Sequence, residues 1–202
     1  MTNSVKHISI VMSVLFAFVA TLLTTSTAMA QSEEPALPEV RFVTTEGAFV
    51  LQLRPDVAPK TVENFLAYVN SGFYDGTIFH RVIPGFMVQA GGFDENLGRK
   101  QTRAPIVNEA TSTLPNLRGT IAMARTNAPD SATSQFFINV ANNDFLNAGV
   151  RGPGYAVFGK VTEGMGVIDR IAGVQTGYQR GMADVPVSPV IIESAEEITK
   201  DN

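Results

Sequence analysis

The stretch FHRVIPGFMVQAGG, Phe79 to Gly92, places an arginine inside a run that otherwise has the composition of a buried strand. Two apolar segments flank the turn pair Pro84-Gly85, and Arg81 lies in the first of them. Arginine is among the residues least often buried without a partner. The stretch therefore predicts either a solvent-facing arginine or an apolar wall built beside a fixed positive charge.

The sequence on either side of this stretch predicts short strands, two helices and long polar connections. A hairpin is expected around Glu46-Gly47, and apolar residues at helical spacing predict a helix between Pro59 and Gly72. A second helix is expected near Met165 to Ala172. The predicted strands cover residues 40–44, 48–53, 78–83, 86–90, 120–124, 136–140, 155–161 and 187–194.

This set of elements predicts a mostly β fold. About eight strands and two helices, without alternation of strand and helix, are typical of a closed eight-stranded antiparallel barrel capped by two α-helices. Pro189 places the last strand at an edge or a bulge. The connections 91–118, 125–134, 142–154 and 173–186 contain no predicted element, and connections of that length tend to carry function.

The first thirty residues have the layout of a secretory signal peptide. Lys6 and His7 precede an apolar segment from Ile8 to Leu23, and Ala28-Met29-Ala30 forms a cleavage site before Gln31. The alternative is an uncleaved membrane anchor, which would need a longer apolar run of about 20 residues. We expect a signal peptide over residues 1–30, a flexible leader over 31–39, one domain over 40–195 and a tail over 196–202, and no membrane anchor after cleavage.

Composition disfavours several classes of function. Removal of residues 1–30 takes away one lysine and no acid, so the formal charge goes from −4 to −5. A mildly acidic domain lacks the basic surface of a nucleic-acid binder. The chain has no cysteine, and His80 is the only histidine left after cleavage. A thiol nucleophile is therefore excluded, and neither a zinc site of the usual type nor a cofactor is expected.

Three ordered motifs resemble the cyclophilin family of peptidyl-prolyl cis/trans isomerases. They are FHRVIPGFMVQ (Phe79 to Gln89), SQFFINV (Ser134 to Val140) and YAVFGKV (Tyr155 to Val161), and the similarity extends from about Val40 to Ser194. The resemblance implies an eight-stranded barrel closed by two helices. It also implies an enzyme that accelerates rotation about Xaa-Pro bonds without a metal or a cofactor.

A signal peptide together with TIAMART (Thr120 to Thr126) and DSATSQFF (Asp130 to Phe137) is similar to the bacterial periplasmic branch of this family. That similarity implies a periplasmic location. It also implies that the partners are proline-containing unfolded or folding polypeptides. Separately, we expect the protein to be a monomer.

The resemblance assigns roles to nine residues. Arg81 matches the family's catalytic arginine, which can offer several hydrogen-bond donors in one plane. Two glutamines match positions that bind the substrate backbone or brace the arginine, and the other six match substrate-binding positions around the proline pocket. These eight substrate-binding residues are Gln89, Gln135, Phe86, Met87, Phe137, Phe145, Leu146 and Tyr155.

This sequence departs from the family pattern at several of these positions. Phe145 stands where many members have tryptophan, so an indole N–H donor is absent and weak binding of the inhibitor cyclosporin is expected. Tyr155 replaces a histidine of the eukaryotic members. Arg125 and Thr126 replace a shorter Asn-Ala pair, which alters contacts to substrate in that loop.

Three alternatives remain open at this point. Strand alternation turns His80 away from the face of Arg81, which favours a buried core histidine bonded to backbone over a catalytic one. The domain could bind proline-containing segments without catalysis, although a pure binder has no need of Arg81. It could also enclose a small lipophilic ligand, but the many Phe, Ile and Val residues favour a filled barrel.

Overall fold

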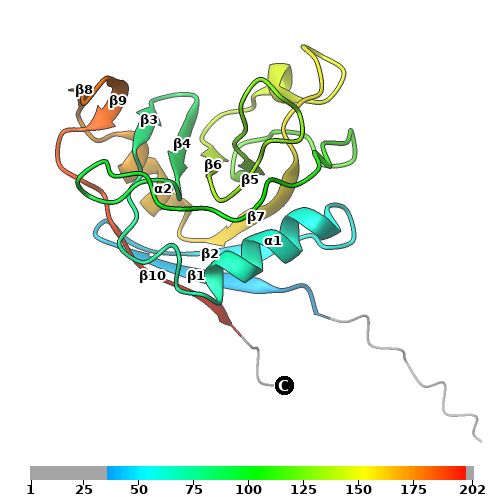
Figure 1. The fold of residues 1–202 in the computed structure, drawn as a ribbon, viewed down its shortest axis with the longest axis horizontal. Coiled ribbons are helices and arrows are strands. Elements are labelled where there is room, and N and C mark those ends of the chain that lie inside the picture. Colours follow the sequence, from blue (N-terminus) through cyan, green and yellow to red (C-terminus); the bar gives the residue numbers. More distant parts are fainter. Residues whose placement is uncertain (1–35, 199–202) are drawn as a thin grey trace, which may run out of the picture. The chain divides into compact units, whose positions relative to one another are not determined.

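The computed structural model describes residues 36–198, and these residues form a mostly β domain with two α-helices (Figure 1). The predicted signal peptide, most of the predicted leader and the last four residues lie outside the described residues. The elements are β1 Glu39–Thr44, β2 Gly47–Leu53, α1 Pro59–Val69, β3 Arg81–Ile83, β4 Met87–Ala90, β5 Thr120–Met123, β6 Phe136–Asn139, η1 Asp144–Leu146, β7 Val157–Glu163, α2 Met165–Ala172, β8 Thr176–Gln179, β9 Met182–Pro186 and β10 Ile192–Ile198.

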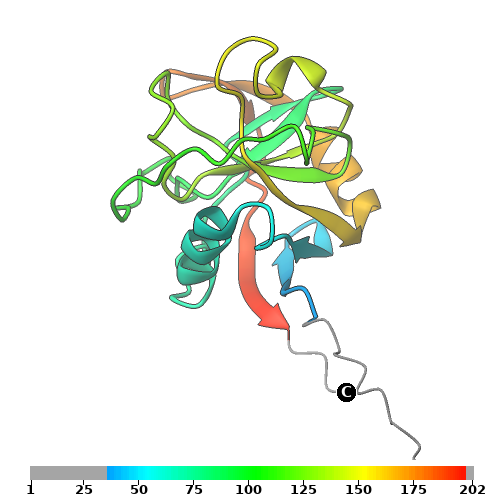
Figure 2. The ribbon, with the colours of Figure 1, turned by 90° about the vertical axis from the view of Figure 1, so that its right-hand side faces the viewer.

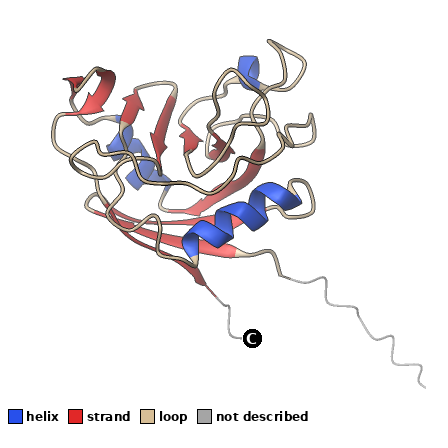
Figure 3. Cartoon of the chain, in the orientation of Figure 1, coloured by secondary structure: helices blue, strands red, loops and turns tan. Residues whose placement is uncertain are grey.

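Eight of the strands form one antiparallel sheet in the order β10-β1-β2-β7-β5-β6-β4-β3. The sheet curls into a half-barrel (Figure 1). Helices α1 and α2 lie on opposite sides of the molecule, with β10 between them in the turned view (Figure 2). Much of the chain between the strands is loop (Figure 3). No helix within residues 36–198 is long and apolar enough to cross a bilayer.

The prediction of a closed barrel is not confirmed, because β3 and β10 remain the two end strands of the sheet. A single isolated bridge, Ile78 to Ile191, joins the segments that precede them. β3 has three residues, so it has few backbone groups with which another strand could pair. Pro189 lies three residues before β10 and has no amide hydrogen to donate, so it cannot act as a donor in a ladder at this edge.

Aromatic side chains fill the interior of the curled sheet. The rings of Phe42 and Phe49 stack at a centroid distance of 5.1 Å, and Phe65 of α1 lies 5.0 Å from Phe158 of β7. Phe136 also contacts Phe42 and Phe65 edge-on, and all five side chains are almost fully buried. The space that an enclosed lipophilic ligand would need is therefore occupied by the protein's own rings.

Helix α1 shows why the periodicity of the sequence predicted it correctly. Pro59 occupies the first turn, where its missing amide hydrogen costs nothing. Val62, Phe65 and Val69 form one buried face, and the helix ends before Gly72, whose φ is +63°. The predicted bounds of α2 match the observed bounds.

The region after α2 differs most from the expectation. The predicted polar connection 173–186 contains the β8–β9 hairpin, whose turn residues Arg180 and Gly181 both have positive φ. This hairpin lies beside β3 in the fold (Figure 1). The last strand is shifted from the predicted 187–194 to Ile192–Ile198, so it continues past the predicted domain end at residue 195.

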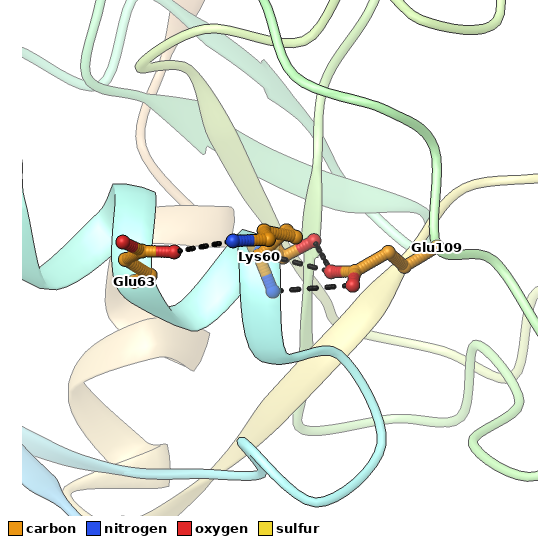
Figure 4. Close-up of polar contacts among 4 residues, drawn as sticks. Lys60, Glu63 and Glu109 are labelled. Atoms are coloured by element: carbon orange, nitrogen blue, oxygen red, sulfur yellow. Dashed lines mark hydrogen bonds and ion pairs between the residues drawn. The ribbon is translucent and has the colours of Figure 1, made fainter.

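The long loop between β4 and β5 is fastened to the start of α1 by Glu109 (Figure 4). Its carboxylate accepts the backbone N–H groups of Lys60 and Thr61 at 3.1 and 2.7 Å, and the Thr61 hydroxyl at 2.7 Å. The residue at the N-cap, Ala58, offers no side-chain cap of its own. Glu109 therefore caps the helix from a distant part of the chain and complements the positive end of the helix dipole.

We predict that Glu109→Ala lowers the free energy of unfolding by about 1–2 kcal/mol, because it removes this cap. The matched control is Glu63→Ala, which removes only the pair between Lys60 and Glu63, whose side chains are 66% and 72% exposed. We expect that control to change stability by less than about 0.5 kcal/mol. Urea unfolding at neutral pH measures both, and equal losses in the two variants would contradict the capping role.

Candidate active site

The register of the sheet brings distant residues into one row. Arg81 of β3 lies opposite Gln89 of β4, Gln89 lies opposite Phe137 of β6, and Phe137 lies opposite Ala122 of β5. Directly opposed residues of antiparallel strands project from the same face of a sheet. Arg81, Gln89 and Phe137 therefore share the outer face of the half-barrel.

The residues between these positions point the other way. Val82, Val88 and Ile138 form the neighbouring row, and each is fully buried in the main core. This alternation answers the question raised by the Phe79–Gly92 stretch. One face of β3 and β4 supplies the core, and the other face carries the arginine beside a second apolar surface.

That second apolar surface is a hydrophobic cluster separate from the main core. Partly buried side chains, most of them from loops, pack against buried ones, so the surface is supported by both sheet and loops. The buried members are Met87, Ala122, Phe137, Leu146 and Val157, and the partly buried ones are Ile83, Phe86, Leu114, Ala124 and Tyr155.

A pocket of about 110 Å³ opens on this surface. Seven of the nine predicted site residues line it, together with two residues outside that set. The lining residues are Arg81, Phe86, Met87, Gln89, Phe137, Leu146 and Tyr155, with Ala124 and Arg125.

Gln135 lies outside the pocket but braces its polar side. Its side-chain oxygen accepts a hydrogen bond from Nε2 of Gln89 at 2.9 Å. A side chain at Gly92 would approach within 2.6 Å of Gln135, so this glycine leaves the room that Gln135 occupies. The arrangement holds Gln89 in place beside Arg81.

Phe145 also lies outside the pocket and supports its rim. Its ring stacks on that of Phe86 at a centroid distance of 5.6 Å, and the guanidinium of Arg151 lies 5.1 Å from the centre of the Phe145 ring. Phe145 belongs to the short helix η1, as does Leu146, which does line the pocket. The loop from β6 to β7 thus supplies one apolar wall.

Tyr155 and Arg125 also line the pocket, and the backbone N–H of Tyr155 donates to the carbonyl of Leu146 at 3.0 Å. The ring of Tyr155 meets Phe137 edge-on at 5.6 Å, and the guanidinium of Arg125 lies 4.4 Å from the centre of the Tyr155 ring. Arg125 also donates from Nε to the carbonyl of Gly154 at 2.9 Å and from Nη1 to that of Thr126 at 2.8 Å. Its guanidinium is therefore held by neutral groups.

Arg81 has an ion-pair partner that sequence reasoning missed. Oδ2 of Asp184 on β9 lies 3.8 Å from Nε of Arg81, and both side chains are about 40% exposed. Asp184 has a φ of +62°, a left-handed conformation that aspartate tolerates better than most residues. The signal that could have indicated it is Arg180-Gly181, a two-residue turn between two strand-length segments.

His80 is buried, as expected for a core histidine. Its side chain is 5% exposed, and its ring lies 4.7 Å from the ring of Phe93. Within the described residues, its Nδ1 has no hydrogen-bond partner. Burial lowers the pKa of His80 from 6.5 to about 4, because the imidazolium would lose its hydration.

We predict that His80 remains neutral well below pH 6. Between pH 6.5 and about 4 the unfolded chain binds a proton at this imidazole and the folded chain does not, so the stabilisation is complete above pH 6.5 and is lost as the pH falls toward 4. The shift corresponds to roughly 3 kcal/mol. NMR titration of the His80 ring nitrogens measures the pKa, and an apparent pKa near 6.5 in the folded protein would contradict this prediction.

Comparison with known proteins agrees with this geometry. The profile of the family described as "Cyclophilin type peptidyl-prolyl cis-trans isomerase/CLD" matches residues 39–197. The chain belongs to this family.

The relatives are all named peptidyl-prolyl cis-trans isomerases. The chain is 61% identical to the isomerase cyp18 of Streptomyces antibioticus, over 78% of this chain and 96% of that protein. It is 57% identical to isomerase A of Dickeya dadantii, over 80% of this chain and 85% of that protein. It is 55% identical to isomerase B of Escherichia coli, over 77% of this chain and 96% of that protein. Membership and these relatives identify the chain as a cyclophilin-type isomerase.

Solved structures show the same fold. The crystal structure of a Cryptosporidium parvum cyclophilin-type isomerase matches with a TM-score of 0.68 at 27% identity, over 82% of this chain and 99% of that chain. A second crystal structure of that cyclophilin, obtained in the presence of the dipeptide Ala-Pro, matches with a TM-score of 0.67.

Proposed function

We propose that this cyclophilin isomerises Xaa-Pro bonds in unfolded or folding secreted proteins. In this proposal Arg81 assists twisting of the prolyl amide above an apolar floor, which consists of Met87, Phe137 and Leu146. The observation that carries the proposal is the single row that joins Arg81, Gln89 and Phe137 across three strands. This row sets a fixed cation and an amide beside an apolar pocket.

The chemistry of the reaction fits this arrangement. Rotation about an Xaa-Pro bond is opposed by amide resonance, and without a catalyst it takes tens to hundreds of seconds. No covalent bond breaks, so the reaction needs no nucleophile. It does need a site that holds the proline ring, fixes the backbone on each side and stabilises the twisted amide.

The residues of the pocket supply these three functions. The apolar floor of Met87, Phe137 and Leu146 packs against the proline ring. Gln89, braced by Gln135, offers polar atoms to the flanking backbone. Arg81 donates a hydrogen bond toward the prolyl nitrogen, which regains its lone pair when the amide twists and becomes an acceptor.

Magnitudes show that Arg81 cannot act alone. Shortening a process of about 100 s to milliseconds is a factor of ~10⁵, or about 7 kcal/mol. A hydrogen bond that involves a charged group contributes roughly 1.5–3 kcal/mol. The remainder comes from desolvation of the amide and from binding the twisted bond more tightly than the planar one. The apolar floor is therefore as necessary as the charge.

We predict that Arg81→Ala lowers kcat/KM for a Xaa-Pro peptide by roughly ten- to a hundredfold, the range expected for loss of one charge-assisted hydrogen bond. The peptide should still bind, because the apolar floor is unchanged. NMR exchange spectroscopy measures the rate, and chemical-shift titration measures binding. The matched control is Arg41→Ala, an exposed arginine of β1 outside the pocket, which should leave the rate unchanged.

Two outcomes of that experiment would count against the proposal. Wild-type protein that binds the peptide without accelerating exchange would favour a proline-binding module without catalysis. An Arg81→Ala variant with the wild-type rate would remove the arginine from the mechanism.

Phe145 leads to a prediction about cyclosporin. Its ring stacks on Phe86 at the pocket rim and has no N–H group to donate, so we propose weak binding of this inhibitor. Calorimetry should give a dissociation constant above one micromolar, and Phe145→Trp should tighten it by roughly tenfold, as expected for one added hydrogen bond. Sub-micromolar affinity of the unaltered protein would contradict the prediction.

We also propose where in the cell this protein acts. The layout of residues 1–30 supports export through a cleaved signal peptide, and the motifs Thr120 to Thr126 and Asp130 to Phe137 support a periplasmic location, where we propose that the protein acts as a monomer. Mass spectrometry of the exported protein tests this, since cleavage at the predicted site gives a chain that begins at Gln31.

A further inference from the structure

Three further depressions adjoin the proline pocket and continue it into a groove. One shares Arg81 with the pocket and has a volume of about 410 Å³. A second, of about 130 Å³, shares Gln89, Ala124 and Arg125 with it. A third, of about 340 Å³, shares Arg125, Leu146 and Tyr155 with it. A peptide with its proline in the pocket would therefore extend over these depressions.

The net charge along this groove is opposite in sign to the net charge of the whole protein. The chain has a formal charge of −4. Yet the four depressions are lined by the arginines Arg81, Arg99, Arg125 and Arg151, and by one acid, Asp184. Asp184 is the ion-pair partner of Arg81. The groove thus carries a net positive charge on an acidic protein.

The other three arginines have no such partner. Among the ion pairs of residues 36–198, none joins a carboxylate to Arg99, Arg125 or Arg151 within 4.0 Å. Arg151 lies over the ring of Phe145, and Arg125 over that of Tyr155. Aromatic rings and backbone carbonyls orient a guanidinium without neutralising it, so these charges remain available to a ligand.

Arg125 is the best placed of the three. It is partly buried, whereas Arg99 and Arg151 are exposed, and two hydrogen bonds to backbone carbonyls fix its position. It also lines the proline pocket and two of the depressions that adjoin it. A carboxylate that enters either of these two depressions from a neighbouring residue of the peptide therefore comes close to Arg125.

Resting on the isomerase function proposed above, we propose that this groove selects Xaa-Pro segments with an aspartate or glutamate within two residues of the proline. Arg125 binds the carboxylate. Arg99 and Arg151, which line the two depressions that share Arg125, add electrostatic attraction for the acidic peptide. A guanidinium held in a fixed plane matches the two oxygens of a carboxylate. Because the charges lie along a groove, they also speed the encounter with acidic segments at low ionic strength.

The test compares matched peptides that differ only in one charge. Acetylated and amidated peptides carry Glu, Gln or Lys either two residues before the proline or directly after it, and NMR exchange spectroscopy gives kcat/KM for each, corrected for the uncatalysed rate. Glu and Gln have the same shape, so their ratio isolates charge. We expect a Glu-to-Gln ratio of about three to ten in at least one position, and a lower rate for Lys than for Gln.

Variants then locate the source of the selectivity. Arg125→Gln should bring the Glu-to-Gln ratio close to one, whereas Arg41→Gln, which removes the same charge from β1, should leave the ratio unchanged. Thermal unfolding shows whether each variant is folded. A measurement that needs no variant is the salt dependence, since the wild-type ratio should fall toward one between about 50 and about 500 mM NaCl.

The results distinguish failure of this inference from failure of the proposed function. Acceleration of the Glu, Gln and Lys peptides to the same extent would overturn acidic selection and leave the isomerase intact. Equal loss of the ratio in Arg125→Gln and Arg41→Gln would overturn the role of Arg125. No acceleration of any peptide would overturn the isomerase function and this inference with it.

Discussion

The register between β3, β4, β6 and β5 is the constraint on which the rest of the site depends. A slip of one residue would exchange the two faces of a strand, sending Arg81 into the core and Val82 to the surface. The pairing is fixed because the inward row of Val82, Val88 and Ile138 is fully buried. The packing of the core thus determines the position of the arginine that faces away from it.

Loops supply the pocket residues that the strands do not. The strands provide Arg81, Met87, Gln89 and Phe137, while Leu146 and Tyr155 come from the connection between β6 and β7. These loop residues are held by packing, since Tyr155 meets Phe137 and Phe145 meets Phe86. A pocket formed in this way before substrate arrives suits a reaction whose catalysis consists of fixing a peptide while one bond rotates.

Much of this could be predicted from the sequence, and the rest depends on contacts between distant segments. Local periodicity was enough for α1 and α2, and the resemblance to the cyclophilin family gave seven residues that line one pocket. Asp184 was missed because the turn at Gly181 lacks a strongly alternating apolar pattern around it. The openness of the sheet between β3 and β10 was also missed, because pairing between strands that are far apart in the sequence leaves no local signal. The charge of the groove is likewise a property of the folded chain, since Arg99, Arg125 and Arg151 come from separate loops.

The central claim is that Arg81 and the apolar floor act on one prolyl bond in a pocket that exists before binding. A crystal structure of this protein with a bound Xaa-Pro peptide tests it most directly. The account predicts the proline ring on Met87, Phe137 and Leu146, with the Arg81 guanidinium within hydrogen-bond distance of the prolyl amide and the register of β3 and β4 unchanged. A peptide bound with its proline elsewhere, or an Arg81 side chain turned away from the prolyl bond, would contradict it.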